Sequence, residues 1–177
     1  MRALLQGAER PFVVLGGTVW DREACADIAK FIESADLPVG NAFRFQDTYD
    51  NRRPNYVGDI GIGLNPKIAE RMRNADVLLV VGMRLGEMTT SGYTLVEVPR
   101  PKQKLIHVHP GADELGRVYQ GELLINSGVK RFARAVRDLK IDGSRWREQT
   151  RAANAEYQAW QKPVPIPGRV QLQEIIL

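Results

Sequence analysis

Short apolar runs alternate along the chain with longer segments in which apolar residues recur every three or four positions. The clearest runs occupy residues 11–15, 76–82 and 104–110, and shorter ones lie at residues 37–39 and 122–126. Runs that are apolar on both faces are typical of buried strands in a parallel sheet. We therefore predict a strand at each of these positions, with 122–126 as a short edge strand.

The segments between these runs carry helical spacing and helix start signals. Residues suited to begin a helix precede the periodic segments: Asp21, Asn65 followed by Pro66, Ser127 and Ser144. Residues 41–55 are polar and irregular, and the glycine-rich segment 58–63 predicts a loop. Alternating strands and helices predict an α/β fold, with a parallel sheet covered by helices on both faces.

In such folds ligands bind beyond the carboxyl ends of the strands. The residues at these ends are the candidate cofactor-binding residues Gly16, Gly17, Gly82, Arg84 and His109. The pair Gly16-Gly17 lets the backbone approach a ligand closely, or it forms a plain strand-to-helix turn. Arg84 is suited to clamp a phosphate or carboxylate, with a structural salt bridge as the alternative.

No catalytic residue and no metal site is predicted. His107 and His109 are two apart on a strand and share one face, but no third ligand joins them in the sequence. Cys25 is the single cysteine, and its place on an apolar helix face predicts a buried core residue. Glu87 and Glu97 have no evident partner for acid–base chemistry.

Composition narrows the class of protein. The 177 residues fit one domain, and a hydrophobic content of 44% supports a core. No apolar run approaches the roughly 20 residues that span a bilayer, and the N-terminus is too quickly polar for a secretory signal, so we expect a cytoplasmic protein with no membrane partner. The net charge of +4 is spread along the chain. The densest basic stretch, 130–137, is typical of the solvent-exposed face of an amphipathic helix, so no nucleic-acid partner is expected.

Five segments resemble, in order and spacing, the central domain of thiamine-diphosphate-dependent enzymes of the acetolactate synthase-like group. They are residues 10–17, 37–40, 56–61, 74–85 and 105–116. The resemblance implies a Rossmann-like three-layer fold with a mostly parallel sheet of about six strands flanked by helices, of the DHS-like NAD/FAD-binding domain type. It also implies a domain core over 1–140, a C-terminal helix over 141–162 and a proline-rich linker over 163–177, which leads towards a diphosphate-binding domain.

In this family the central domain holds FAD in some members and ADP or coenzyme A in others, and in many it holds nothing. Arg84 matches an arginine that lies near the flavin. Other positions depart from the family pattern: Gly86-Glu87 replace two aspartates, Ile62-Gly63-Leu64 replace Met-His-Gly, and His107 and His109 replace aspartates. These departures weigh against FAD.

The resemblance further implies a parent enzyme that uses thiamine diphosphate and Mg²⁺, acts on 2-oxo acids as a transferase or a lyase/decarboxylase, and forms a homo-oligomer. Its N-terminal pyrimidine-binding domain supplies a glutamate, and its C-terminal diphosphate-binding domain holds Mg²⁺; neither is in this sequence. We thus expect a central domain, structural or nucleotide-binding, that is not itself catalytic. The alternative is a stand-alone FAD/ADP-binding Rossmann-like module or a purely structural domain.

Overall fold

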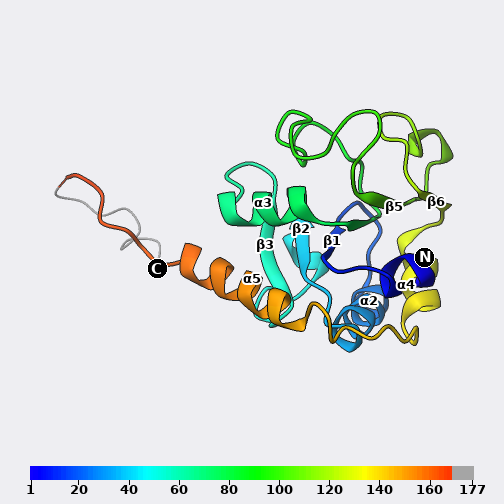
Figure 1. The fold of residues 1–177 in the computed structure, drawn as a ribbon, viewed down its shortest axis with the longest axis horizontal. Helices are drawn as coiled ribbons and strands as arrows, with labels where there is room; N and C mark the ends of the chain where they lie inside the picture. The colour runs from blue at the N-terminus through cyan, green and yellow to red at the C-terminus, as the bar shows by residue number, and fades with distance from the viewer. Residues whose placement is uncertain (169–177) are drawn as a thin grey trace.

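The computed structural model describes residues 1–168, which form one parallel sheet with helices on both of its faces (Figure 1). The six strands lie in the order β3-β2-β1-β4-β5-β6, and every neighbouring pair is parallel. The predicted Rossmann-like three-layer fold is thereby confirmed. The strands are β1 (Pro11–Leu15), β2 (Val39–Ala42), β3 (Tyr56–Ile60), β4 (Val77–Val81), β5 (Lys104–His109) and β6 (Leu123–Asn126).

The helices divide between the two faces of the sheet. They are α1 (Arg2–Gln6), α2 (Arg22–Ser34), α3 (Pro66–Asn74), α4 (Val129–Val136) and α5 (Arg147–Trp160), and two short 3₁₀ helices are η1 (Gln46–Thr48) and η2 (Ala112–Glu114). Side chains of α1, α2 and α4 pack in one core, which we call the α2/α4 core. Side chains of α3 and Ala153 of α5 pack in a second core, the α3/α5 core.

Strand β1 shows why the buried runs are apolar throughout. Val13 and Leu15 belong to the α2/α4 core, whereas Phe12 and Val14 belong to the α3/α5 core. Successive side chains of a strand point to opposite faces, so a strand between two helical layers needs apolar residues at every position.

Two of the predicted helix starts are confirmed, and one is wrong. The side chain of Asp21 accepts a hydrogen bond from the Ala24 amide at 2.9 Å, and that of Asn65 accepts one from the Lys67 amide at 3.0 Å. Ser127 does not cap α4, whose N-cap is Gly128. The Ser127 amide donates instead to the carbonyl of His109 at 3.1 Å, so this residue still belongs to the end of the sheet.

The structure also corrects two strand predictions. Residues 58–63 are not simply a loop, because β3 runs from Tyr56 to Ile60 at the edge of the sheet. Gly58 has φ +121° within this strand, and a Cβ there would meet the ring of Tyr157 at 3.2 Å. The second strand begins at Val39, later than predicted, and ends in the segment 41–55, which was expected to be irregular.

Long loops lie at one end of the sheet. The segment 82–103 between β4 and β5 forms the green loops above β5 in Figure 1. The last helix begins near the predicted Ser144 and occupies Arg147–Trp160, inside the predicted range 141–162. The predicted linker 163–177 lies partly outside the described residues. Within residues 1–168, no helix combines the length and the hydropathy that a bilayer crossing requires.

Candidate functional site

A crevice of about 670 Å³ opens beyond the carboxyl ends of β1, β4 and β5. Gly17, Gly82, Arg84 and His109 line it, so the structure brings four of the five candidate residues to one cavity. The fifth, Gly16, is buried behind the crevice.

The two glycine turns press against each other. Gly17 has φ +80° and Gly82 has φ +82°, conformations that favour glycine. A Cβ on Gly17 would collide with the Gly82 carbonyl, and one on Gly82 would lie 2.5 Å from the Gly16 carbonyl oxygen and collide with Val129. The close approach that these glycines allow is therefore one between two segments of the chain itself, as the turn alternative requires.

Arg84 forms the ion pair that was the alternative to a ligand clamp. Its Nε lies 3.3 Å from Oε1 of Glu114 in η2, and Arg117 approaches the other oxygen of Glu114 at 3.8 Å. The Arg84 side chain is nevertheless 55% exposed, whereas that of Glu114 is 13% exposed. A single long contact to a half-exposed guanidinium is weak, so an anionic ligand in the crevice can compete for Arg84.

The two histidines lie side by side, with ring centroids 5.9 Å apart. His107 is buried, and its Nε2 donates to the Met83 carbonyl at 2.9 Å. Burial is the main cause that lowers the pKa of His107. In His109 the Nδ1 atom lies 3.1 Å from the Gly111 amide nitrogen, which leaves Nε2 for other contacts. Over residues 1–168, no three His, Cys, Asp or Glu side chains gather where they could hold a metal ion.

Sequence reasoning missed much of the crevice wall. Phe43, Phe45, Met88 and Tyr93 supply aromatic and apolar surface, and all come from segments without regular spacing. The signal that could have pointed to them is their position, since Phe43 and Phe45 directly follow β2, and Met88 and Tyr93 lie in the segment 82–103 that follows β4.

Cys25 corrects a further prediction, because it is partly exposed rather than buried. Its neighbour Ala24 and the residue one turn later, Ile28, occupy the buried stripe of α2, and Cys25 lies one position beside it. Partial burial raises the pKa of the Cys25 thiol, which favours its neutral form.

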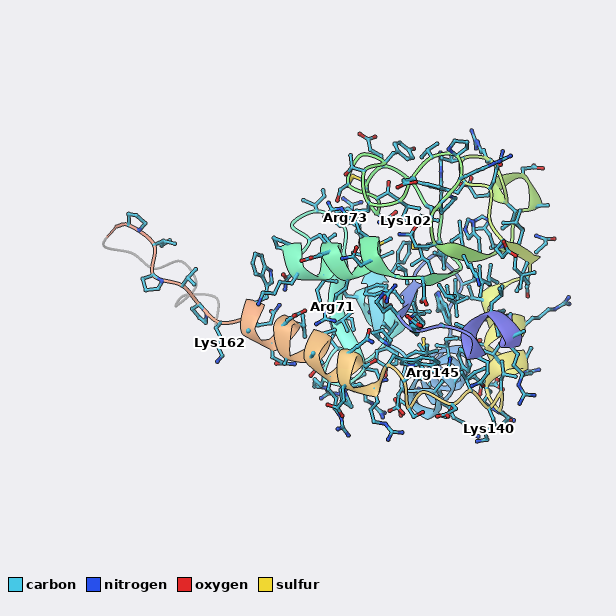
Figure 2. The ribbon with its side chains drawn as sticks, in the orientation of Figure 1. Arg71, Arg73, Lys102, Lys140, Arg145 and Lys162 are labelled. Atoms are coloured by element: carbon cyan, nitrogen blue, oxygen red, sulfur yellow. The ribbon has the colours of Figure 1, made fainter. Side chains whose placement is uncertain are left out.

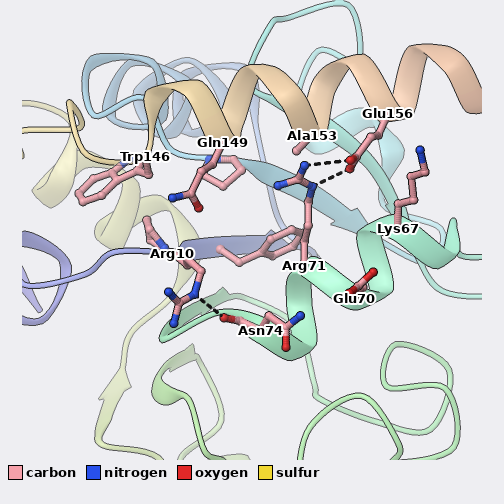
Figure 3. A pocket seen from close by; sticks show the side chains of 12 residues that line it. Arg10, Lys67, Glu70, Arg71, Asn74, Trp146, Gln149, Ala153 and Glu156 are labelled. Atoms are coloured by element: carbon pink, nitrogen blue, oxygen red, sulfur yellow. Dashed lines mark hydrogen bonds and ion pairs between the residues drawn. The ribbon is translucent and has the colours of Figure 1, made fainter.

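A second cavity, of about 390 Å³, lies at the opposite end of the strands between α3 and α5 (Figure 3). Arg71 of α3 reaches across it to Glu156 of α5, with nitrogen–oxygen distances of 2.6 and 2.9 Å. The Arg71 guanidinium lowers the pKa of Glu156. This bidentate pair joins α3 to α5 across the cavity, so we assign it to holding the two helices together.

Basic side chains are distributed over separate parts of the molecule. The labelled side chains in Figure 2 come from α3, from the loop before β5, from the segment between α4 and α5, and from beyond the end of α5. In this view they are spread from Lys162, beyond the end of α5, to Lys140, at the opposite lower edge of the ribbon.

The parallel sheet with a crevice at its carboxyl end defines a Rossmann-like domain. Residues 1–136 match the family model described as "Thiamine pyrophosphate enzyme, central domain". The chain therefore belongs to this family, and its resemblance to the acetolactate synthase-like group is confirmed.

Curated relatives are several times longer than this chain. Sulfoacetaldehyde acetyltransferase of Rhodobacter capsulatus is 28% identical over 154 residues, which are 86% of this chain and 26% of that protein. The acetolactate synthase large subunit of Corynebacterium glutamicum is 24% identical over 153 residues, 86% of this chain and 22% of that protein. The 3D-(3,5/4)-trihydroxycyclohexane-1,2-dione hydrolase of Geobacillus thermodenitrificans is 29% identical over 92 residues, 52% of this chain and 14% of that protein.

Membership of the family implies thiamine diphosphate as the cofactor. The residues of this chain do not fit that group. The sequence contains no G-D-G motif, and the part that the structure describes gathers no carboxylates for a diphosphate-bound metal ion. No chemical step through thiamine diphosphate can be assigned to these residues.

Proposed function

We propose that this chain is the central domain of a larger thiamine-diphosphate-dependent, acetolactate synthase-like enzyme that acts on 2-oxo acids, and that it is not itself catalytic. The match over residues 1–136, together with a chain that covers about a quarter of its relatives, carries this proposal. An N-terminal pyrimidine-binding domain and a C-terminal diphosphate-binding domain would hold the cofactor and Mg²⁺. The parent would be a cytoplasmic homo-oligomer with transferase or lyase/decarboxylase activity.

We further propose that the crevice holds the diphosphate of an ADP-type nucleotide. Arg84 supplies a half-exposed guanidinium, and Phe45 and Tyr93 offer ring surface in the same cavity. A cavity of about 670 Å³ is within the usual range for a small-molecule site. His109 stands where the flavin-binding members carry an aspartate, which favours ADP or coenzyme A over FAD.

Thermal denaturation of the 177-residue chain with ADP, coenzyme A or FAD tests whether the crevice binds a nucleotide. A ligand at a hundred times its Kd stabilises the folded state by about 2.7 kcal/mol. For a domain of this size, that raises the melting temperature by about 5–11 °C. We expect the shift with ADP, and we expect Arg84→Gln to abolish it. Arg117→Gln is the matched control, because Arg117 also contacts Glu114 but does not line the crevice. If none of the three nucleotides raises the melting temperature, the proposal of a nucleotide site fails and a purely structural domain is favoured.

The length and sequence of the natural polypeptide test the proposal of a larger parent enzyme. A polypeptide several times longer, with a glutamate-bearing domain before Met1 and a G-D-G motif after Leu177, is the expected result. A natural chain that stops near Leu177 would overturn the proposal of a larger thiamine-diphosphate-dependent enzyme. It would favour the stand-alone nucleotide-binding module.

A further inference from the structure

A third cavity lies at the outer edge of the sheet, where β3 meets the end of α5. Its volume is about 290 Å³, and it shares no lining residue with the crevice. Asp59 of β3, Gln46 of η1, and Tyr157 and Trp160 of α5 line it. We call it the Asp59 pocket. This volume suits an end group of a ligand rather than a whole nucleotide.

Within residues 1–168, Asp59 is a carboxylate without a positively charged partner. Its Oδ1 accepts one hydrogen bond, from Nε2 of Gln46 at 2.8 Å. Among residues 1–168, no lysine, arginine or histidine forms an ion pair with it, although Asp50 and Glu156 nearby in the fold each have one. Burial raises the pKa of Asp59, because a charge that is partly removed from water is disfavoured.

Two aromatic rings complete the pocket. Tyr157 is fixed by an edge-to-face contact with Tyr56, with ring centroids 4.9 Å apart. Trp160 is 55% exposed, and it is therefore one of the large apolar side chains that the fold leaves in water. Aromatic faces attract cations, and a carboxylate binds them directly.

We propose that the Asp59 pocket binds the cationic end group of a guanidinium or alkylammonium compound. Asp59 would accept hydrogen bonds from the cation, Gln46 would hold the carboxylate in place, and the rings of Tyr157 and Trp160 would cover the cation's face. The cation would come from a free small molecule or from an arginine or lysine of a second copy of this basic chain. The proposal does not depend on a nucleotide in the crevice.

Nuclear magnetic resonance of the ¹⁵N-labelled 177-residue chain provides the test. The chain has three tryptophans, so Trp160→Phe assigns the indole signal of Trp160. Titration with ethylguanidinium chloride should shift this signal to saturation, whereas sodium chloride at equal ionic strength should not. Asp59→Asn should weaken binding at least about tenfold, which corresponds to ~1.4 kcal/mol.

Asp50→Asn is the matched control, because Asp50 pairs with Arg52 and lies outside the pocket. It should leave the titration unchanged. The indole signals of Trp20 and Trp146 report whether each variant is folded. Dilution of the ligand-free chain separates the sources: a shift of the Trp160 signal that Asp59→Asn removes identifies a second copy as the donor. A non-saturating ethylguanidinium shift with no dilution effect, or equal affinity in Asp59→Asn, would overturn the proposal.

Discussion

At the scale of single residues, two backbone turns that leave no space for a side chain shape the crevice. Gly17 and Gly82 both have positive φ, and each would place a Cβ against the backbone of the other turn. The ends of β1 and β4 therefore approach each other directly, and Arg84 emerges immediately beyond this contact. Any ligand at Arg84 depends on a turn that the two glycines make possible.

Gly82→Ala should lower the free energy of unfolding by about 2–4 kcal/mol, since it adds both a left-handed alanine and an overpacked contact with Val129. Urea denaturation measures the change. Gly63→Ala is the control, because Gly63 has φ +75° but nothing within 4 Å of its Cβ position. It should cost only about 1 kcal/mol. Equal costs for the two variants would contradict the contact between the turns.

His107 should make stability depend on pH. Burial lowers its folded pKa below the ordinary 6.5, so between these two values the unfolded chain binds more protons than the folded chain. The contribution is thus fully present above about pH 6.5 and is lost as the pH falls through the folded pKa. His107→Gln keeps an amide donor for the Met83 carbonyl and does not titrate. Between pH 7.5 and 5, the free energy of unfolding of the His107→Gln variant should fall less than that of the wild type. Urea denaturation at each pH measures both, and equal pH dependence in the two proteins would exclude a contribution from His107.

Single-residue environments were only partly predictable from the sequence. The apolar run before Arg84 placed it at the end of a strand, and the structure confirms that position. Its partner Glu114 lies thirty positions later in a short 3₁₀ helix, and no local spacing connects the two. The partial exposure of Cys25 was missed for a simpler reason: the buried stripe of a helix is narrow, and one position decides the outcome.

At the scale of elements, the central strands and the edge strand β6 were predictable from the sequence, and the edge strand β3 was not. Strands β1 and β4 are continuous apolar runs because helices cover both of their faces. In β5 the four residues from Leu105 to Val108 are buried, and His107 is the one polar residue among them. Strand β3 contains Gly58 and Asp59, which resemble loop residues. It is a strand because it pairs in parallel with β2. Helix α5, from far along the chain, covers it, and Nδ2 of Asn154 donates to the Tyr56 carbonyl at 2.7 Å.

The ion pair between α3 and α5 should stabilise this cover. A double-mutant cycle with Arg71→Gln and Glu156→Gln should give a coupling of about 1 kcal/mol, because the contact is bidentate and both side chains are less than a third exposed. The control cycle uses Glu148 and Arg151 of α5, which are 82% and 67% exposed and should couple by about 0.3 kcal/mol. Urea unfolding of each variant supplies the energies, and equal couplings would show that the α3–α5 pair adds nothing beyond a surface contact.

At the scale of the whole molecule, the central sheet joins two cores that share strands but not side chains. The α2/α4 core and the α3/α5 core lie on opposite faces, and β1 contributes alternate residues to each. Because the two cores share strands, a change in one core is transmitted to the other. The single sheet should therefore unfold in one cooperative transition.

Val14→Ala tests this coupling, because it removes methyl groups from the α3/α5 core while Trp146 reports from the α2/α4 core. In a Trp160→Phe background, the variant should lose about 2 kcal/mol, and tryptophan fluorescence and circular dichroism should report the same loss. Val13→Ala, on the other face of β1, should behave alike. A fluorescence midpoint that Val14→Ala leaves unchanged would mean that the cores unfold separately. A ligand in the crevice would then stabilise only the layer that it contacts.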